Sequence, residues 1–157
     1  MGAETMSLPL EEKMPFEQGD KGVSYGYKNT GANVVDEFGN VDTIELVNIS
    51  QADALAWPET VYKKYPRTVN ASMESTVRPF MERSGMINTT VLKIFERRLG
   101  LPEGELLKKH SGGGFSSNEA RVNRCPPCAP GDDKRVAFGS HTDFGSLASA
   151  AVLSHDS

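Results

Sequence analysis

The chain has 157 residues, a net charge of −4 and 38% hydrophobic residues, which suits one domain of ordinary size. The acidic balance argues against a nucleic-acid partner, because such proteins normally present a basic face. No apolar run approaches the roughly 18 residues of a membrane span, and residues 1–10 lack the basic start and apolar stretch of a signal peptide. We therefore expect a soluble, cytoplasmic protein without a membrane partner.

The first part of the chain predicts a loose arm, then loops, then one short helix. Residues 1–20 are polar and interrupted by Met and Pro, which is typical of a loosely held N-terminal arm. Residues 21–40 are rich in Gly, Asn and Tyr, and this composition favours turns, with short strands at most. Ser50 and the residues after it predict a capped helix that ends at Trp57-Pro58.

The strongest periodic pattern runs from Thr68 to Leu99. Apolar residues recur there at steps of three and four, which places them on one face of a helix. Pro79 and Gly85 lie inside this span, so they predict a kink or a break into two helices. Asn88 could cap the second of these helices.

Beyond residue 100 the pattern predicts one more helix and then strands. Pro102 and the acidic residues after it favour a helix that runs to about His110 and stops at the glycines 112–114. Runs compatible with β-strands follow at residues 120–125, 135–138 and 146–153. The sequence therefore predicts an α+β chain with helices first and strands later.

His141-Thr142-Asp143 is the most suggestive short motif. Residues two apart in an extended strand face the same side, so this imidazole and this carboxylate could hold one metal ion. Non-haem Fe(II) oxygenases use two His and one carboxylate on one face of the ion. Taken alone, such a triplet is more often a surface turn.

Two further sets of residues have a functional and a structural interpretation. Cys125 and Cys128 have the spacing of a redox pair, but the Pro and Gly that follow cannot open the helix that such a pair requires. A zinc site would combine them with His141, whereas two structural cysteines beside a turn is the favoured interpretation. Arg121 and Arg124 could bind an anionic ligand if their strand lines a pocket, although solvated surface arginines are commoner.

Two stretches together are far more specific than these parts. Residues 121–127 read Arg-Val-Asn-Arg-Cys-Pro-Pro, and residues 137–146 read Ala-Phe-Gly-Ser-His-Thr-Asp-Phe-Gly-Ser. They resemble the isopenicillin N synthase-like Fe(II)/2-oxoglutarate-dependent oxygenases, which show Arg-x-Asn-x-x-Pro-Pro, a short loop and Gly-x-His-Thr-Asp. The variants in this chain look like fungal members, and the resemblance extends over roughly residues 20–147.

The resemblance implies a helical N-terminal region over residues 21–114 and the first strands of an incomplete jelly roll, or double-stranded β-helix, over residues 115–157. His141 and Asp143 would be two of the three iron ligands, and Asn123 would help to hold the cosubstrate 2-oxoglutarate. Members of the family oxidise small organic molecules by hydroxylation, desaturation or ring closure, often in secondary metabolism. They convert 2-oxoglutarate to succinate and CO2 in the process.

Two departures from the family pattern shape the expected function. Cys125 occupies the place of a family Tyr that also contacts the cosubstrate. The family's second His ligand and its Arg-x-Ser clamp lie many residues further on, and this chain ends soon after Asp143. We therefore expect a truncated family member without coupled turnover of its own. The alternatives are a non-catalytic product that binds a partner or relative through an exposed sheet edge or helix face, and a small zinc-binding module.

Overall fold

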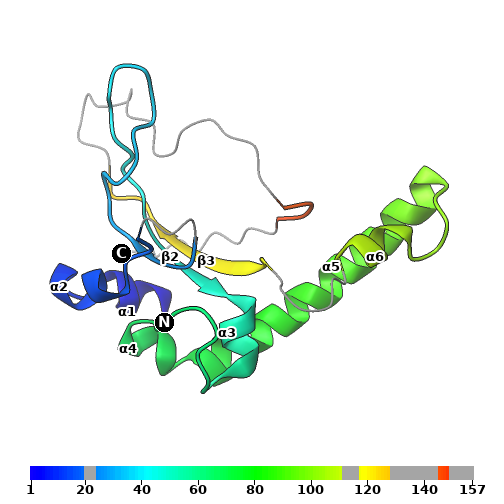
Figure 1. Ribbon diagram of the computed structural model, residues 1–157, viewed down its shortest axis with the longest axis horizontal. Helices are drawn as coiled ribbons and strands as arrows, with labels where there is room; N and C mark the ends of the chain where they lie inside the picture. The colour runs from blue at the N-terminus through cyan, green and yellow to red at the C-terminus, as the bar shows by residue number, and fades with distance from the viewer. Residues whose placement is uncertain (20–23, 111–116, 128–144, 149–157) are drawn as a thin grey trace.

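The computed structural model describes residues 1–19, 24–110, 117–127 and 145–148, which form an α+β fold (Figure 1). The described strands are β1 (Gly26–Lys28), β2 (Glu45–Ser50) and β3 (Glu119–Arg124). They form an antiparallel sheet in the order β1-β2-β3. The predicted strand at residues 120–125 is thus confirmed as β3, whereas the expected order of helices first and strands later is wrong.

Strand β2 is the central strand and the one that sequence patterning missed. All six of its residues are buried, so the strand does not show the alternation of apolar and polar residues that marks a half-exposed strand. Its register places Val47 between Tyr27 of β1 and Val122 of β3. The sheet therefore joins segments that lie far apart in the sequence.

The first residues pack against this sheet, so the expectation of a loose arm is wrong. They form α1 (Gly2–Met6), α2 (Leu10–Lys13) and the 3-10 helix η1 (Met14–Phe16). Met6 and Lys13 are each 3% exposed, and the Lys13 ammonium pairs with the buried Glu45 of β2. The helices are too short to show a hydrophobic period, which is why composition alone suggested an arm.

The capped helix predicted after Ser50 is confirmed as α3 (Gln51–Ala56). The Ser50 hydroxyl accepts hydrogen bonds from the backbone N–H groups of Ala52 at 3.1 Å and Asp53 at 3.4 Å. Such a cap satisfies donors that the first turn of a helix leaves unpaired. The helix ends at Trp57, as the Trp57-Pro58 pair predicted.

The long periodic span forms three helical pieces, and the last of them begins one residue before Pro79, one of the two positions where the sequence predicted a kink or break. The pieces are α4 (Arg67–Asn70), the π-helix η2 (Met73–Val77) and α5 (Arg78–Leu99). Pro79 lies in the first turn of α5. A proline has no backbone N–H, and it is tolerated in this turn because the N–H groups there have no acceptor within the helix. Gly85 and Asn88 lie inside α5, so neither breaks nor caps a helix.

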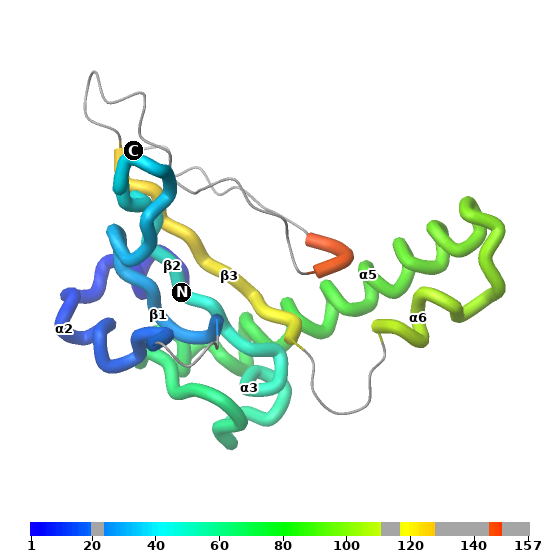
Figure 2. The backbone as a smooth tube through the Cα atoms, turned by 45° about the horizontal axis from the view of Figure 1, so that its top comes forward, coloured from blue at the N-terminus to red at the C-terminus, as the bar shows by residue number. Residues whose placement is uncertain are grey.

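After α5 the chain turns back on itself. The helix predicted up to His110 is confirmed as α6 (Glu105–His110), and it packs beside the far half of α5 (Figure 2). The predicted strands at residues 135–138 and 146–153 and the glycines 112–114 lie wholly or partly outside the described residues. In the part of the chain that is described, no helix has the length and apolar character to cross a membrane.

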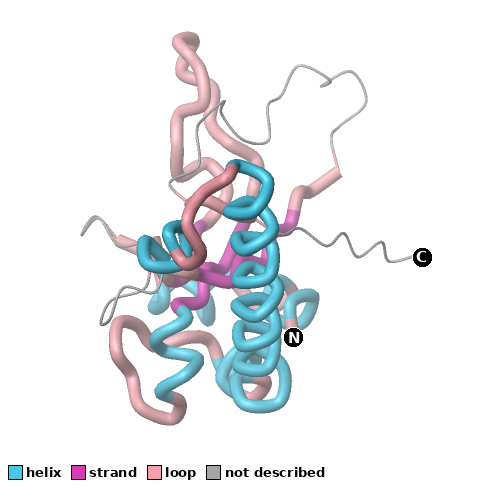
Figure 3. Tube along the Cα trace, turned by 90° about the vertical axis from the view of Figure 1, so that its right-hand side faces the viewer, coloured by secondary structure: helices cyan, strands magenta, loops and turns pink. Residues whose placement is uncertain are grey.

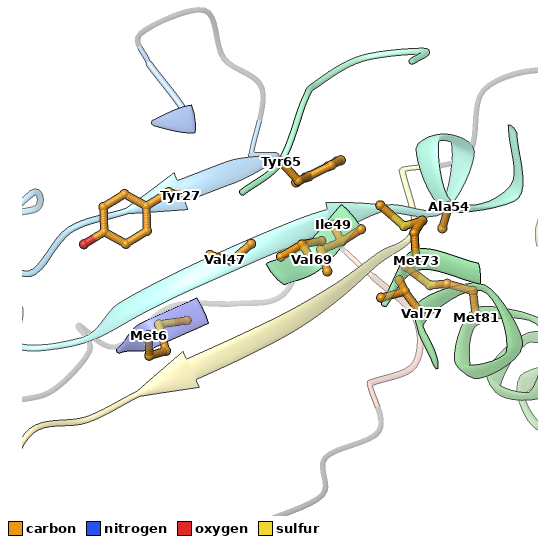
Figure 4. Packing of buried hydrophobic residues seen from close by; sticks show 10 residues of the cluster. All are labelled: Met6, Tyr27, Val47, Ile49, Ala54, Tyr65, Val69, Met73, Val77 and Met81. Atoms are coloured by element: carbon orange, nitrogen blue, oxygen red, sulfur yellow. The ribbon is translucent and has the colours of Figure 1, made fainter. Parts of the chain in front are cut away.

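The hydrophobic core lies between one face of the sheet and the helices (Figure 4). Figure 3 shows the strands at the centre of the described chain, with helices around them. Ten buried side chains form this core. They are those of Met6, Tyr27, Val47, Ile49, Ala54, Tyr65, Val69, Met73, Val77 and Met81. Beyond Met81, α5 runs away from the sheet and leaves large apolar side chains exposed (Figure 1).

Candidate functional site

The two faces of the sheet differ in chemistry because successive residues of a strand point to opposite sides. Tyr27, Val47 and Val122 share the face that packs on the helices. Asn123 lies on the other face, opposite Leu46 of β2, and its side chain is exposed. The residue that the resemblance assigns to the cosubstrate is therefore accessible and lies away from the core.

A chain of hydrogen bonds holds the guanidinium of Arg121 on the same face as Asn123. Arg121 Nε donates to Asn48 Oδ1 at 2.7 Å, and Arg121 Nη2 donates to Glu119 Oε1 at 2.7 Å. Asn48 is buried and donates from Nδ2 to the Ser24 carbonyl at 2.8 Å. The Ser24 hydroxyl donates to Glu119 Oε2 at 2.9 Å. The cation is thus fixed in position by strands β2 and β3.

Asn123 and Arg121 are the exposed residues of β3 on this face. They lie two residues apart on one strand, so their side chains leave the sheet on the same side. Arg121 uses two of its five N–H donors within the network. The side-chain amide of Asn123 makes no hydrogen bond to another described residue. The Glu119 carboxylate already pairs with Arg121, so the side-chain amide of Asn123 is the group on this face that is left to donate to a carboxylate ligand.

A separate charged cluster lies on the opposite face, around Glu45 at the end of β2. Its carboxylate accepts hydrogen bonds from Lys13 Nζ and from the Tyr27 hydroxyl, the latter at 2.8 Å. Arg124 Nη2 lies 2.5 Å from the second carboxylate oxygen of Glu45. Arg124 and Arg121 therefore lie on opposite faces, and they cannot share a ligand as a pair.

Burial and charge act in opposite directions on Glu45. Burial raises the pKa of its carboxyl, but the hydrogen bonds from Lys13 and Tyr27 and the charges of Lys13 and Arg124 outweigh it. The pKa of Glu45 therefore lies below its ordinary value, and the carboxylate is charged at neutral pH. Burial, followed by the hydrogen bond to Glu45, raises the pKa of Tyr27, so this phenol keeps its proton.

The remaining predicted site residues divide into those that are described and those that are not. Cys125 follows β3 directly and is an exposed free thiol beside Arg124. Cys128, His141 and Asp143 lie outside the described residues, so neither the predicted iron ligands nor the zinc alternative is tested. Among the described residues, no group of three or more His, Cys, Asp or Glu side chains could hold a metal ion.

Sequence reasoning did not find the cluster around Glu45. One clue was present, because Glu45 interrupts an apolar run from Ile44 to Ile49, and a charged residue in a buried strand needs a partner. No local pattern marked Lys13 as that partner. It lies 32 positions earlier, in a segment that composition predicted to be loose.

Comparisons with known proteins identified no relative of this chain. No family model, no curated protein and no solved structure matches the chain. The resemblance to the 2-oxoglutarate oxygenases therefore stays a prediction that rests on the sequence motifs.

Proposed function

We propose that the chain belongs to an Fe(II)/2-oxoglutarate-dependent oxygenase that oxidises a small organic molecule. In this proposal β3 is the first strand of a jelly roll, and Asn123 contacts 2-oxoglutarate. His141 and Asp143, outside the described residues, supply two of the iron ligands. The ion would supply the activation of oxygen that oxidises a C–H bond.

One structural observation supports the proposal more than any other. Asn123 is exposed on the polar face of the sheet, on the same side as Arg121 and opposite the hydrophobic core. A dicarboxylate cosubstrate carries two charges, and it needs donors that do not already belong to the core. The side-chain amide of Asn123 meets that requirement.

The proposal is tested by binding of Fe(II) and 2-oxoglutarate to the chain without oxygen. Chelation of Fe(II) by a 2-oxo acid gives a visible charge-transfer absorption, which reports the joint complex. We expect this absorption with the wild-type chain and its loss in His141→Ala. Asn123→Ala should weaken 2-oxoglutarate binding about tenfold, the cost of one hydrogen bond to a charged group.

Asn33→Ala is the matched control, because this asparagine is exposed on a loop and only its backbone atoms form hydrogen bonds to Asp42. It should bind 2-oxoglutarate as the wild type does. The proposal fails if His141→Ala leaves that absorption unchanged, or if Asn123→Ala and Asn33→Ala bind 2-oxoglutarate equally well.

The exposed side of α5 favours a second candidate function, association with another protein. Phe80, Ile87, Ile94 and Phe95 lie along this helix and are between 44% and 59% exposed. Contiguous apolar side chains of this kind on a soluble protein often mark an interaction surface. The outer edge of β3 has no partner strand among the described residues and offers backbone groups for pairing.

Sedimentation velocity at increasing concentration tests this second candidate. We expect the wild type to form larger species, and the double variant Ile87→Lys with Ile94→Lys to remain a monomer. Phe38→Lys is the control, because Phe38 is 82% exposed but lies on a loop far from α5. A wild type that is monomeric at every concentration, without exposed apolar surface, would count against association.

A further inference from the structure

A groove lies between the N-terminal helices and the end of the sheet, on the face opposite Asn123. Its volume is about 610 Å³. Met6, Leu8 and Leu10 form one wall, and Pro126-Pro127 form another. Ser7, Asn29 and Thr30 line it as well, so the groove combines apolar and polar side chains.

The floor of this groove carries more positive than negative charge. Lys13 and Glu45 side chains are each 4% exposed, and both Lys13 and Arg124 pair with the single carboxylate of Glu45. Among the residues that line the groove, these two cations therefore share one carboxylate. Glu17, which is exposed, is the other carboxylate whose charge acts on this cluster, through Tyr27.

Arg124 is the group of the cluster that a ligand can reach. Its side chain is 50% exposed, and its contact with Glu45 uses Nη2. The guanidinium has five N–H donors in a planar fork, so donors remain for a second carboxylate. Lys13 also lines the groove, but its side chain is only 4% exposed, so it acts on a ligand mainly by its charge.

We propose that this groove binds a small amphipathic carboxylate, with the carboxylate on Arg124 and a short apolar body against Leu8, Leu10 and Pro126. Pockets for small ligands generally combine apolar walls with a few polar groups that fix orientation. The site is separate from the proposed cosubstrate position, because Arg124 and Asn123 leave β3 on opposite sides. It does not depend on iron or on 2-oxoglutarate.

Cys125 provides the means to test this proposal, since its thiol is exposed and lines the groove. In a Cys128→Ser background, the rate at which iodoacetamide alkylates Cys125 is measured with increasing hexanoate. We expect hexanoate to slow alkylation in a saturable way, and 1-hexanol, which lacks the carboxylate, to have little effect. Arg124→Gln should weaken hexanoate binding about tenfold or more.

Arg83→Gln is the control, because it removes an exposed arginine of α5 that does not line the groove. It should leave hexanoate binding unchanged. Leu10→Glu changes an apolar wall residue that is 46% exposed and should abolish binding without touching the charged cluster. Urea unfolding of each variant shows whether it is folded.

Two results would overturn the proposal. One is the absence of saturable protection of Cys125 by hexanoate in the folded wild type. The other is equal weakening in Arg83→Gln and Arg124→Gln, which would indicate a general charge effect. Neither result bears on the oxygenase proposal, whose readout is the complex of Fe(II) with 2-oxoglutarate.

Discussion

Asp53 shows at the residue scale how one buried carboxylate organises a loop. It lies in the first turn of α3 and is 2% exposed. Its Oδ1 accepts hydrogen bonds from the backbone N–H groups of Val61 and Tyr62, both at 2.8 Å, and its Oδ2 accepts one from the Tyr65 hydroxyl at 2.7 Å. These bonds close the loop between α3 and α4 against the core.

Replacement of Asp53 by Asn should destabilise the fold strongly. An amide offers one acceptor oxygen where the carboxylate offers two, so at least one buried donor loses its partner. We expect the free energy of unfolding to fall by about 2–3 kcal/mol, measured by urea denaturation. Glu59→Gln, an exposed change in the same loop, should stay within about 0.5 kcal/mol. Equal stability of the two variants would show that Asp53 does not hold the loop.

Residue-scale prediction from the sequence succeeded where the partners are neighbours. The Ser50 cap was predictable because its acceptor and donors lie within three residues. The partners of Asp53 lie up to 12 positions away, and Lys13 and Glu45 are 32 positions apart. Such pairs depend on the tertiary fold, so no local pattern indicates them.

At the scale of elements, α5 contains one glycine and is followed by another, and the two have different backbone conformations. Gly85 lies in the middle of a continuous helix of 22 residues, and a side-chain carbon there would meet nothing within 4 Å. Gly100 ends the helix with φ +66°, while the N–H of Leu101 bonds the Glu96 carbonyl at 2.9 Å. This is the Schellman arrangement, which favours glycine because a β-carbon strains the left-handed conformation.

Alanine should therefore have opposite effects at these two positions. Gly85→Ala should stabilise the protein by about 0.5–1 kcal/mol, because alanine loses less backbone entropy in a helix. Gly100→Ala should destabilise it by about 1 kcal/mol through strain at positive φ. Thermal unfolding followed by circular dichroism measures both. If Gly85→Ala is destabilising, α5 is kinked at this residue, as its sequence alone suggested.

Element boundaries were harder to predict than the elements themselves. The apolar period correctly indicated helix over most of residues 68–99, and Val69, Met73, Val77 and Met81 lie in the core. The division into α4, η2 and α5 follows the packing of these residues against the sheet, and a π-helix has no sequence period of its own. The same period also ran on to Ile94 and Phe95, which are exposed.

At the scale of the whole molecule, the sheet depends on the N-terminal helices. Met6 belongs to the core cluster (Figure 4). Lys13 neutralises the buried carboxylate of Glu45. The Thr5 hydroxyl of α1 lies 2.7 Å from the Thr68 hydroxyl of α4, so α1 contacts this helix as well as the sheet. The α+β class was predictable from composition and pattern, whereas this closure between distant segments was not.

Removal of residues 1–16 tests this dependence directly. A loose arm could be removed without cost, but a chain that begins at Glu17 loses Met6 from the core and leaves Glu45 without Lys13. A large core side chain and a broken buried ion pair each contribute several kcal/mol, so we expect stability to fall by about 3–5 kcal/mol or more. Urea denaturation and limited proteolysis of the shortened chain measure the loss.

The full-length variant Lys13→Met separates the two contributions, because it keeps an apolar side chain of similar length while removing the charge. It should lose less stability than the truncation, since Arg124 and Tyr27 still bond Glu45 and Met6 stays in the core. Glu4→Gln, at an exposed position of α1, is the control and should change little. A shortened chain with the same urea midpoint as the full chain would show that the sheet folds without its N-terminal helices.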